Sequence, residues 1–116
     1  MFGTRKERLN HQLQQEIALI LQREVKDPDL GFVTVTRVEL SNDLSYAKVG
    51  FSCLGDSDTQ LRCQHALDRS SGYVRSLVKK RLRLRIIPQL VFRFDESIAG
   101  SIDLLSKLDQ LKQQQR

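Results

Sequence analysis

The sequence is poor in the residues that build metal centres and aromatic binding surfaces. It has no tryptophan, two cysteines and two histidines, and only 6% of its 116 residues are aromatic. Cys53 and Cys63 do not form a C-x-x-C pair, and together with His11 and His65 they match no common zinc-binding spacing. We therefore expect no metal or other cofactor, and no row of aromatic rings on which nucleic-acid bases stack.

Long apolar runs and catalytic motifs are missing as well. No apolar segment approaches the roughly 20 residues of a membrane span, and residues 1–6 lack the apolar stretch of a secretory signal. No nucleophile stands in a strand–turn–helix setting, and the sequence has no phosphate-binding loop. We expect a single cytoplasmic domain that has no membrane partner and is not an enzyme.

Acidic residues are absent between positions 69 and 93, although this stretch holds eight of the 19 lysines and arginines. The eight are Arg69, Arg75, Lys79, Lys80, Arg81, Arg83, Arg85 and Arg93. The chain has a formal net charge of +5, so the remaining residues are net acidic. A solvated helix face normally alternates the two signs of charge, whereas a one-sided positive field suits a polyanion such as a nucleic-acid backbone.

The first third of the chain predicts an amphipathic helix over residues 5–25. Thr4 and Glu7 form a capping-box pair at its start, and apolar residues then recur at spacings of three and four. Pro28 ends the helix, because the residue before a proline disfavours the helical conformation.

Two strands are expected next, over residues 32–40 and 46–53, joined as an antiparallel hairpin. The apolar positions of the first strand change parity between Val35 and Val38. An extra residue in one strand explains such a change, and we therefore predict a β-bulge at Thr36–Arg37.

The remaining elements are a helix pair from about residue 57 to 83, a third strand at 90–94 and a last helix beginning at Ser97. Gly72 marks the joint of the helix pair, whose outward face carries a basic stripe. A strand that follows another through intervening helices lies parallel to its neighbour. The predicted class is α+β, with a mixed three-stranded sheet and helices packed on one face.

This αββααβ core is the layout of a KH module, an RNA-binding domain with a G-x-x-G loop between its two central helices. The sequence contains no G-x-x-G and has Ser70, Ser71 and Gly72 at the joint instead. One glycine permits a bend but does not open the same tight loop, so a kinked helix pair is expected there.

The sequence resembles the ribosome-binding factor A family, whose members are assembly factors of the small ribosomal subunit. The matching stretches are Glu16-Ile17, Ile20-Leu21, residues 26–31 (KDPDLG), 33–41 (VTVTRVELS), 43–44, 47–49, 71–75 (SGYVR), 84–90 (LRIIPQL) and 94–97 (FDES). The resemblance implies a KH type II fold, with a small-x-Gly kink in place of the G-x-x-G loop. The expected organisation is one KH-like domain over residues 1–111, followed by a frayed polar tail at 112–116.

The resemblance also implies a function. The protein would bind immature small subunits and the 5′-terminal helix region of their rRNA, assist late maturation and rRNA processing, act as a monomer, and be released by a ribosome-associated GTPase. The candidate RNA contacts are Ser70, Ser71, Gly72, Arg75, Lys79, Lys80, Arg83 and Arg85. Composition and spacing alone leave open a nonspecific binder of DNA or RNA, or one that dimerises through its C-terminal apolar stripe.

Overall fold

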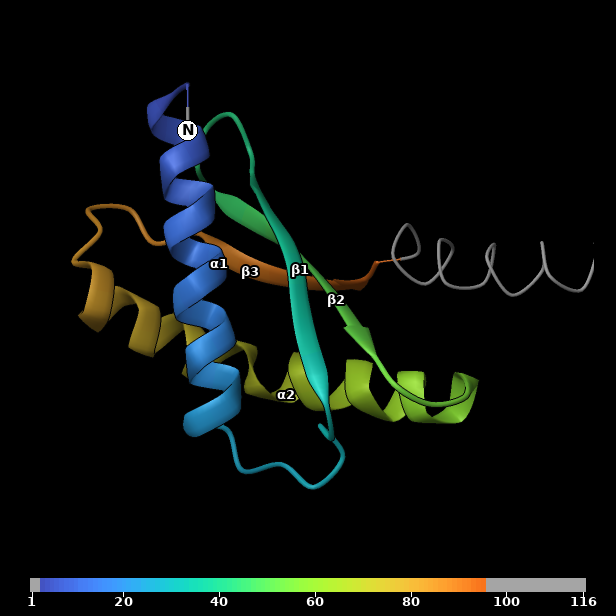
Figure 1. The fold of residues 1–116 in the computed structure, drawn as a ribbon. Helices are drawn as coiled ribbons and strands as arrows, with labels where there is room; N and C mark the ends of the chain where they lie inside the picture. Colours follow the sequence, from blue (N-terminus) through green and yellow to red (C-terminus); the bar gives the residue numbers. More distant parts are fainter. Residues whose placement is uncertain (1–2, 96–116) are drawn as a thin grey trace, which may run out of the picture.

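The computed structural model describes residues 3–95, which form two helices and three strands in the order αββαβ (Figure 1). The elements are α1 (Arg5–Arg23), β1 (Val33–Leu40), β2 (Tyr46–Cys53), α2 (Ser57–Leu82) and β3 (Gln89–Phe94). The strand order is β1-β2-β3, with β1 antiparallel and β3 parallel to β2. The predicted α+β class and mixed sheet are confirmed, whereas the predicted helix from Ser97 and the predicted tail at 112–116 lie outside the described residues.

Helix α1 begins where its capping residues predict. Thr4 accepts a hydrogen bond from the Glu7 backbone N–H at 3.0 Å, and the Glu7 carboxylate accepts one from Gly3 N–H at 3.0 Å. These bonds satisfy amide groups that have no partner within the helix. Four residues on one side of α1 are buried, namely Leu13, Ile17, Ile20 and Leu21, so this helix closes the core over the sheet.

Strand β1 contains the predicted bulge. Val35 pairs with Phe51 and Arg37 pairs with Gly50, so Thr36 is the extra residue. The insertion keeps the apolar residues on either side of Thr36 on the core face of the sheet, since an extra residue restores the alternation. The predicted β-bulge at Thr36–Arg37 is therefore confirmed as the cause of the parity change in the sequence.

Helix α2 differs from the predicted helix pair, because residues 57–82 form one helix without interruption. Gly72 is not among the residues with a positive φ, and the helical assignment continues through Ser70 and Ser71. A glycine in a helix interior lowers stability without breaking the helix when both flanking segments are well packed. Val74 and Val78, which follow the glycine, are fully buried.

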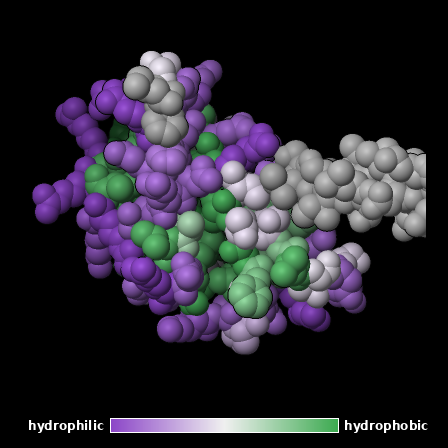
Figure 2. Space-filling view, viewed as in Figure 1, coloured by the Kyte–Doolittle hydropathy of each residue, from purple (hydrophilic) through white to green (hydrophobic). Residues whose placement is uncertain are grey.

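Both helices pack against one face of the sheet, and the hydrophobic core lies between the two layers (Figure 1). Figure 2 shows that apolar side chains also reach the surface alongside α1 and over one end of β1. Phe32, just before β1, is 85% exposed. Neither helix of residues 3–95 is long and apolar enough to cross a bilayer.

Candidate nucleic-acid interface

The C-terminal half of α2 has an apolar inner face and a basic outer face. Val74 and Val78 lie in the core, and Lys79, Lys80 and Arg83 are exposed. Residues three and four apart share one side of a helix, so the alternation of apolar and basic residues in the sequence becomes two separate faces. The predicted basic stripe is therefore present on the surface.

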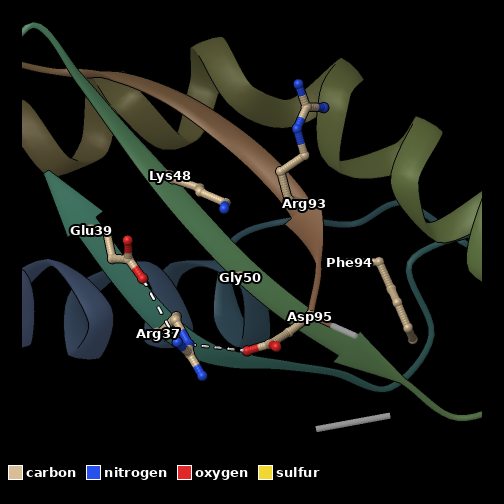
Figure 3. Close-up of a pocket in the computed structure, with 7 residues that line it drawn as sticks. All are labelled: Arg37, Glu39, Lys48, Gly50, Arg93, Phe94 and Asp95. Atoms are coloured by element: carbon tan, nitrogen blue, oxygen red, sulfur yellow. Dashed lines mark ion pairs between the residues drawn. The ribbon is translucent and has the colours of Figure 1, made fainter. Parts of the chain in front are cut away.

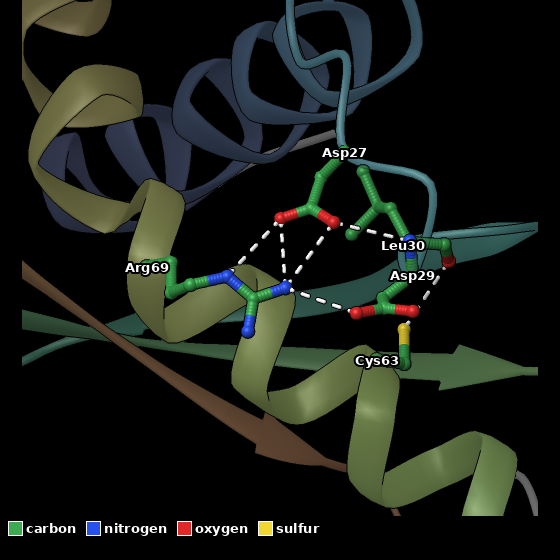
Figure 4. A network of polar contacts seen from close by, with 5 residues as sticks. All are labelled: Asp27, Asp29, Leu30, Cys63 and Arg69. Carbon is green, nitrogen blue, oxygen red and sulfur yellow. Dashed lines mark hydrogen bonds and ion pairs between the residues drawn. The ribbon is translucent and has the colours of Figure 1, made fainter.

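Arg69 belongs to the acid-free stretch of residues 69–93, the basic window, but it is held by two aspartates of the loop after α1 (Figure 4). Its Nη2 lies 2.9 Å from Oδ2 of Asp27 and 3.3 Å from Oδ2 of Asp29. The backbone N–H of Asp29 and the guanidinium of Arg69 lower the pKa of the Asp27 carboxyl. This cluster ties the loop to α2, and the Arg69 charge is compensated within the protein.

Arg81 and Arg75 are also engaged within the fold. Arg81 lies 3.0 Å from a carboxylate oxygen of Glu16 and 3.2 Å from one of Glu24, both associated with α1. The guanidinium of Arg75 donates hydrogen bonds to the backbone carbonyls of residues 87–88, at 2.9 and 3.2 Å. Arg81 thus joins the two helices, and Arg75 supports the segment that leads into β3.

Four cations at or near the end of α2 form no ion pair within residues 3–95: Lys79, Lys80, Arg83 and Arg85. Arg83 adopts the left-handed conformation, with φ of 51°, and ends α2. The chain turns back at this point, so Arg85 lies beyond the helix while the two lysines remain on its outer face. Arg75 also has no carboxylate partner within residues 3–95, but its guanidinium is used by two backbone carbonyls, so these four residues are the predicted cations that the described part of the chain leaves unengaged.

The joint residues lie earlier on the same helix. Ser70 and Ser71 are half-buried, and the hydroxyl of Ser71 donates to the Asp68 carbonyl at 3.0 Å. Gly72 is exposed, and a Cβ placed there would meet no atom within 4 Å. The helix backbone at Gly72 is therefore open to close approach by a partner.

The face of the sheet opposite α1 and α2 holds a second polar surface (Figure 3). Its pocket, of 360 Å³, is lined by Arg37, Glu39, Lys48, Gly50, Arg93, Phe94 and Asp95. Arg37 lies 3.7 Å from Glu39 and 3.3 Å from the buried Asp95. The two signs of charge are mixed here, so this surface is a weaker attractor of a polyanion than the outer face of α2.

Two further cations, Arg5 and Lys6, were missed by the sequence reasoning. They line a 420 Å³ pocket together with Arg85 of the basic window. Cations are disfavoured in the first turn of a helix, because the helix dipole is positive there. Their unfavourable position at the start of α1 was thus the one signal in the sequence that could have marked them as candidate functional residues. Their proximity to Arg85 follows only from the fold.

The fold and this surface together define a small KH-like α+β domain whose long helix presents a cationic outer face. No cluster of three or more metal-ligating side chains occurs within residues 3–95. The sequence has no G-x-x-G motif, and α2 continues without interruption through Ser70, Ser71 and Gly72, where a KH module has that loop.

The chain belongs to the ribosome-binding factor A family, whose model matches residues 5–108. It is 51% identical over 108 residues to ribosome-binding factor A of Natranaerobius thermophilus, covering 93% of this chain and 82% of that protein. The crystal structure of ribosome-binding factor A from Thermus thermophilus is similar with a TM-score of 0.68 and 30% identity, covering 76% of this chain and 92% of that one. A model of Thermus thermophilus ribosome-binding factor A, fitted into a cryo-EM map of its 30S complex, has a TM-score of 0.64 and 28% identity and covers 77% and 93% of the two chains.

Proposed function

We propose that this protein binds the immature small ribosomal subunit through its rRNA and assists late maturation and rRNA processing near the 5′-terminal helix. The observation that carries the proposal is the row of exposed cations Lys79, Lys80 and Arg83 along the outer face and at the end of α2, for which residues 3–95 provide no ion-pair partner. Membership of the family and the 30S complex of the Thermus thermophilus relative support the same partner.

The contact uses charge and shape. Lysines and arginines that neutralise phosphates release condensed counterions, which drives binding irrespective of base sequence. The described residues include neither a G-x-x-G loop nor a row of exposed aromatic rings. Selectivity therefore comes from the way a folded ribonucleoprotein presents its phosphates, with the open backbone at Gly72 allowing one of them to approach closely.

The role is that of a non-catalytic cytoplasmic factor. In this proposal the protein acts as a monomer, needs no cofactor, and leaves the mature subunit when a ribosome-associated GTPase acts. Binding to the immature subunit supplies the free energy that holds the rRNA in a state ready for processing, and no bond is made or broken by the protein itself.

Cosedimentation at near-physiological salt tests the proposal. The protein is mixed with small subunits, with intact ribosomes and with free rRNA of matched length, and the bound fraction is measured for each. We expect retention on small subunits and much weaker retention on the other two. Equal retention on all three would make the protein a nonspecific polyanion binder.

A further inference from the structure

A pocket of 420 Å³ lies where the start of α1, the β1–β2 turn and the segment after α2 meet. Its lining is Arg5, Lys6, Leu9, Asn42, Leu44, Leu84, Arg85 and Ile86. Four of these side chains are aliphatic, three are cationic, one is an amide and none is acidic. The volume falls in the lower part of the range of roughly 300–1,000 Å³ found for small-ligand sites.

The pocket is built by contacts between distant parts of the chain. The left-handed Arg83 ends α2 and redirects residues 84–86, and Arg75 holds the two following carbonyls. On the opposite side, Lys6 Nζ donates to Asn42 Oδ1 at 3.0 Å. The pocket is therefore present before any ligand binds, which lowers the entropic cost of binding.

The chemistry of the lining separates into two parts. Leu9, Leu44, Leu84 and Ile86 supply aliphatic surface, and Ile86 is 58% exposed. Arg5, Lys6 and Arg85 supply positive charge without an acidic partner in the pocket. The amide oxygen of Asn42 is used by Lys6, so its NH₂ group is the donor that a ligand acceptor can meet.

We propose that this pocket holds one unpaired nucleotide of RNA. The base lies on the aliphatic side chains and receives a hydrogen bond from the Asn42 amide, while the adjoining phosphate contacts Arg5, Lys6 and Arg85. Positive charge next to the N-terminus of α1 adds to the helix dipole, and both favour a phosphate. This inference rests on the proposed function and adds a contact to an unpaired base, beside the shape-based contact of α2.

Position along the chain connects the pocket to that surface. Arg83 ends the row on α2, and Arg85, two residues later, lines the pocket. An RNA strand that follows Gly72, Lys79 and Arg83 along the helix reaches the pocket at the helix end. Sequence-specific RNA-binding proteins commonly bind unstacked bases of single-stranded RNA, since a paired base is not free to enter a pocket.

Two matched variants test the pocket. Ile86→Asp places a carboxylate in it, whereas Leu61→Asp makes the same change at a leucine near the other end of α2, where the side chain is 56% exposed against 58% for Ile86. Ile86→Ser removes the aliphatic contact without adding charge. Circular dichroism on each variant establishes that the fold is retained.

Fluorescence anisotropy is measured with a single-stranded RNA hexamer and with a blunt duplex of the same length. We expect wild-type protein to prefer the single strand. Ile86→Asp should weaken hexamer binding about tenfold or more and Ile86→Ser about threefold to tenfold, with little change for the duplex beyond that of Leu61→Asp. If Ile86→Asp weakens the affinity for hexamer and duplex equally, or leaves the preference for the single strand unchanged, the proposed nucleotide site is wrong.

Two controls separate this inference from its alternatives. If an acidic peptide displaces the hexamer from wild-type protein but not from Ile86→Asp, the pocket binds peptide and the nucleotide assignment is wrong. If Ile86→Asp keeps the wild-type preference for the single strand and wild-type protein cosediments with small subunits, the nucleotide site is wrong and the proposed function stands. If wild-type protein shows no selective cosedimentation, the proposed function fails, whatever the hexamer shows.

Discussion

The basic window contains three arginines at intervals of six residues, Arg69, Arg75 and Arg81. Each has a different role in the fold, because each faces a different group. Arg69 binds a loop carboxylate 42 positions away, and Arg81 binds Glu16, 65 positions away. Arg75 instead supports two backbone carbonyls. The sequence predicts the charge of these residues but not their partners, because the partners approach only once the chain has folded.

Asp43 provides a prediction about pH at the same scale. The hydroxyl of Ser45, followed by that of Ser41, each at 2.7 Å, lowers the pKa of Asp43 from 3.8 to about 2. A carboxyl with a lowered folded-state pKa stabilises the protein above its unfolded pKa, and this contribution is lost as the pH falls from about 4 through 2. We expect Asp43→Asn to lower the free energy of unfolding at pH 7.

Urea unfolding at several pH values checks the sign. The difference between wild type and Asp43→Asn should be constant above pH 5 and much smaller at pH 2, since the wild-type carboxyl, whose folded-state pKa is about 2, is then half protonated. A difference of the same size at pH 2 and pH 7 would mean that the turn depends on the shape of the side chain and not on its charge.

At the scale of elements, α2 shows where local patterns mislead. A glycine in the middle of a helical pattern, preceded by two serines, favoured a joint between two helices. Val74 and Val78 after the glycine are buried, as are Cys63, Ala66 and Leu67 before it, so both halves of the helix pack on the same core. The bulge in β1 was predictable, by contrast, since the apolar alternation of the strand itself records it.

Gly72→Ala should stabilise the protein by about 0.5–1 kcal/mol. The residue lies in a helix without a positive φ, and a Cβ meets no atom within 4 Å, so alanine gains helix propensity at no steric cost. Thermal or urea unfolding measures the change. A lower stability than wild type would show that Gly72 does not have helical geometry in solution.

Gly50→Ala should have the opposite sign, with a loss of about 1–3 kcal/mol. On the sheet face opposite α1 and α2, a Cβ at Gly50 would lie 2.8 Å from Thr36 Oγ1 and 3.3 Å from Asp95 Oδ2. Those two side chains are hydrogen-bonded to each other across the strand, so they cannot both move away cheaply. Unfolding under the same conditions as for Gly72→Ala is the check, and equal stability would contradict the close packing seen at the bulge.

At the scale of the whole molecule, the strands and the basic stripe were predictable because each leaves a periodicity in the sequence, and the mixed sheet was predictable because a strand reached through a helical connection lies parallel to its neighbour. The pocket at the end of α2 was not, since Leu9, Asn42 and Ile86 come from three segments that only the fold brings together. The sequence also could not show which of the eight basic residues form ion pairs within the protein and which do not. Pairing with Asp27, Glu16 and Glu24 depends on tertiary contacts.

The free cations give a prediction for salt dependence. If Lys79 and Lys80 each neutralise one phosphate, changing both to Gln should reduce the slope of log affinity against log salt concentration by roughly 0.7–0.9 per residue. Arg69→Gln should leave the slope nearly unchanged, because Asp27 and Asp29 already compensate its charge. Titrations with small subunits from 50 to 200 mM salt measure both slopes. An equal reduction for Arg69→Gln would contradict the assignment of free and compensated charges.

The most direct measurement of the central claim compares two double variants that have the same change in net charge. Lys79→Glu with Lys80→Glu reverses the outer face of α2, and Lys26→Glu with Lys48→Glu reverses two exposed lysines elsewhere. Cosedimentation with small subunits at near-physiological salt, after circular dichroism has shown both variants to be folded, gives the bound fraction of each. The account predicts that the Lys79/Lys80 variant is lost from the subunit fraction while the Lys26/Lys48 variant remains bound at close to the wild-type level. Equal loss for the two variants, or retention of both, would contradict the claim that the outer face of α2 is the surface that binds the subunit.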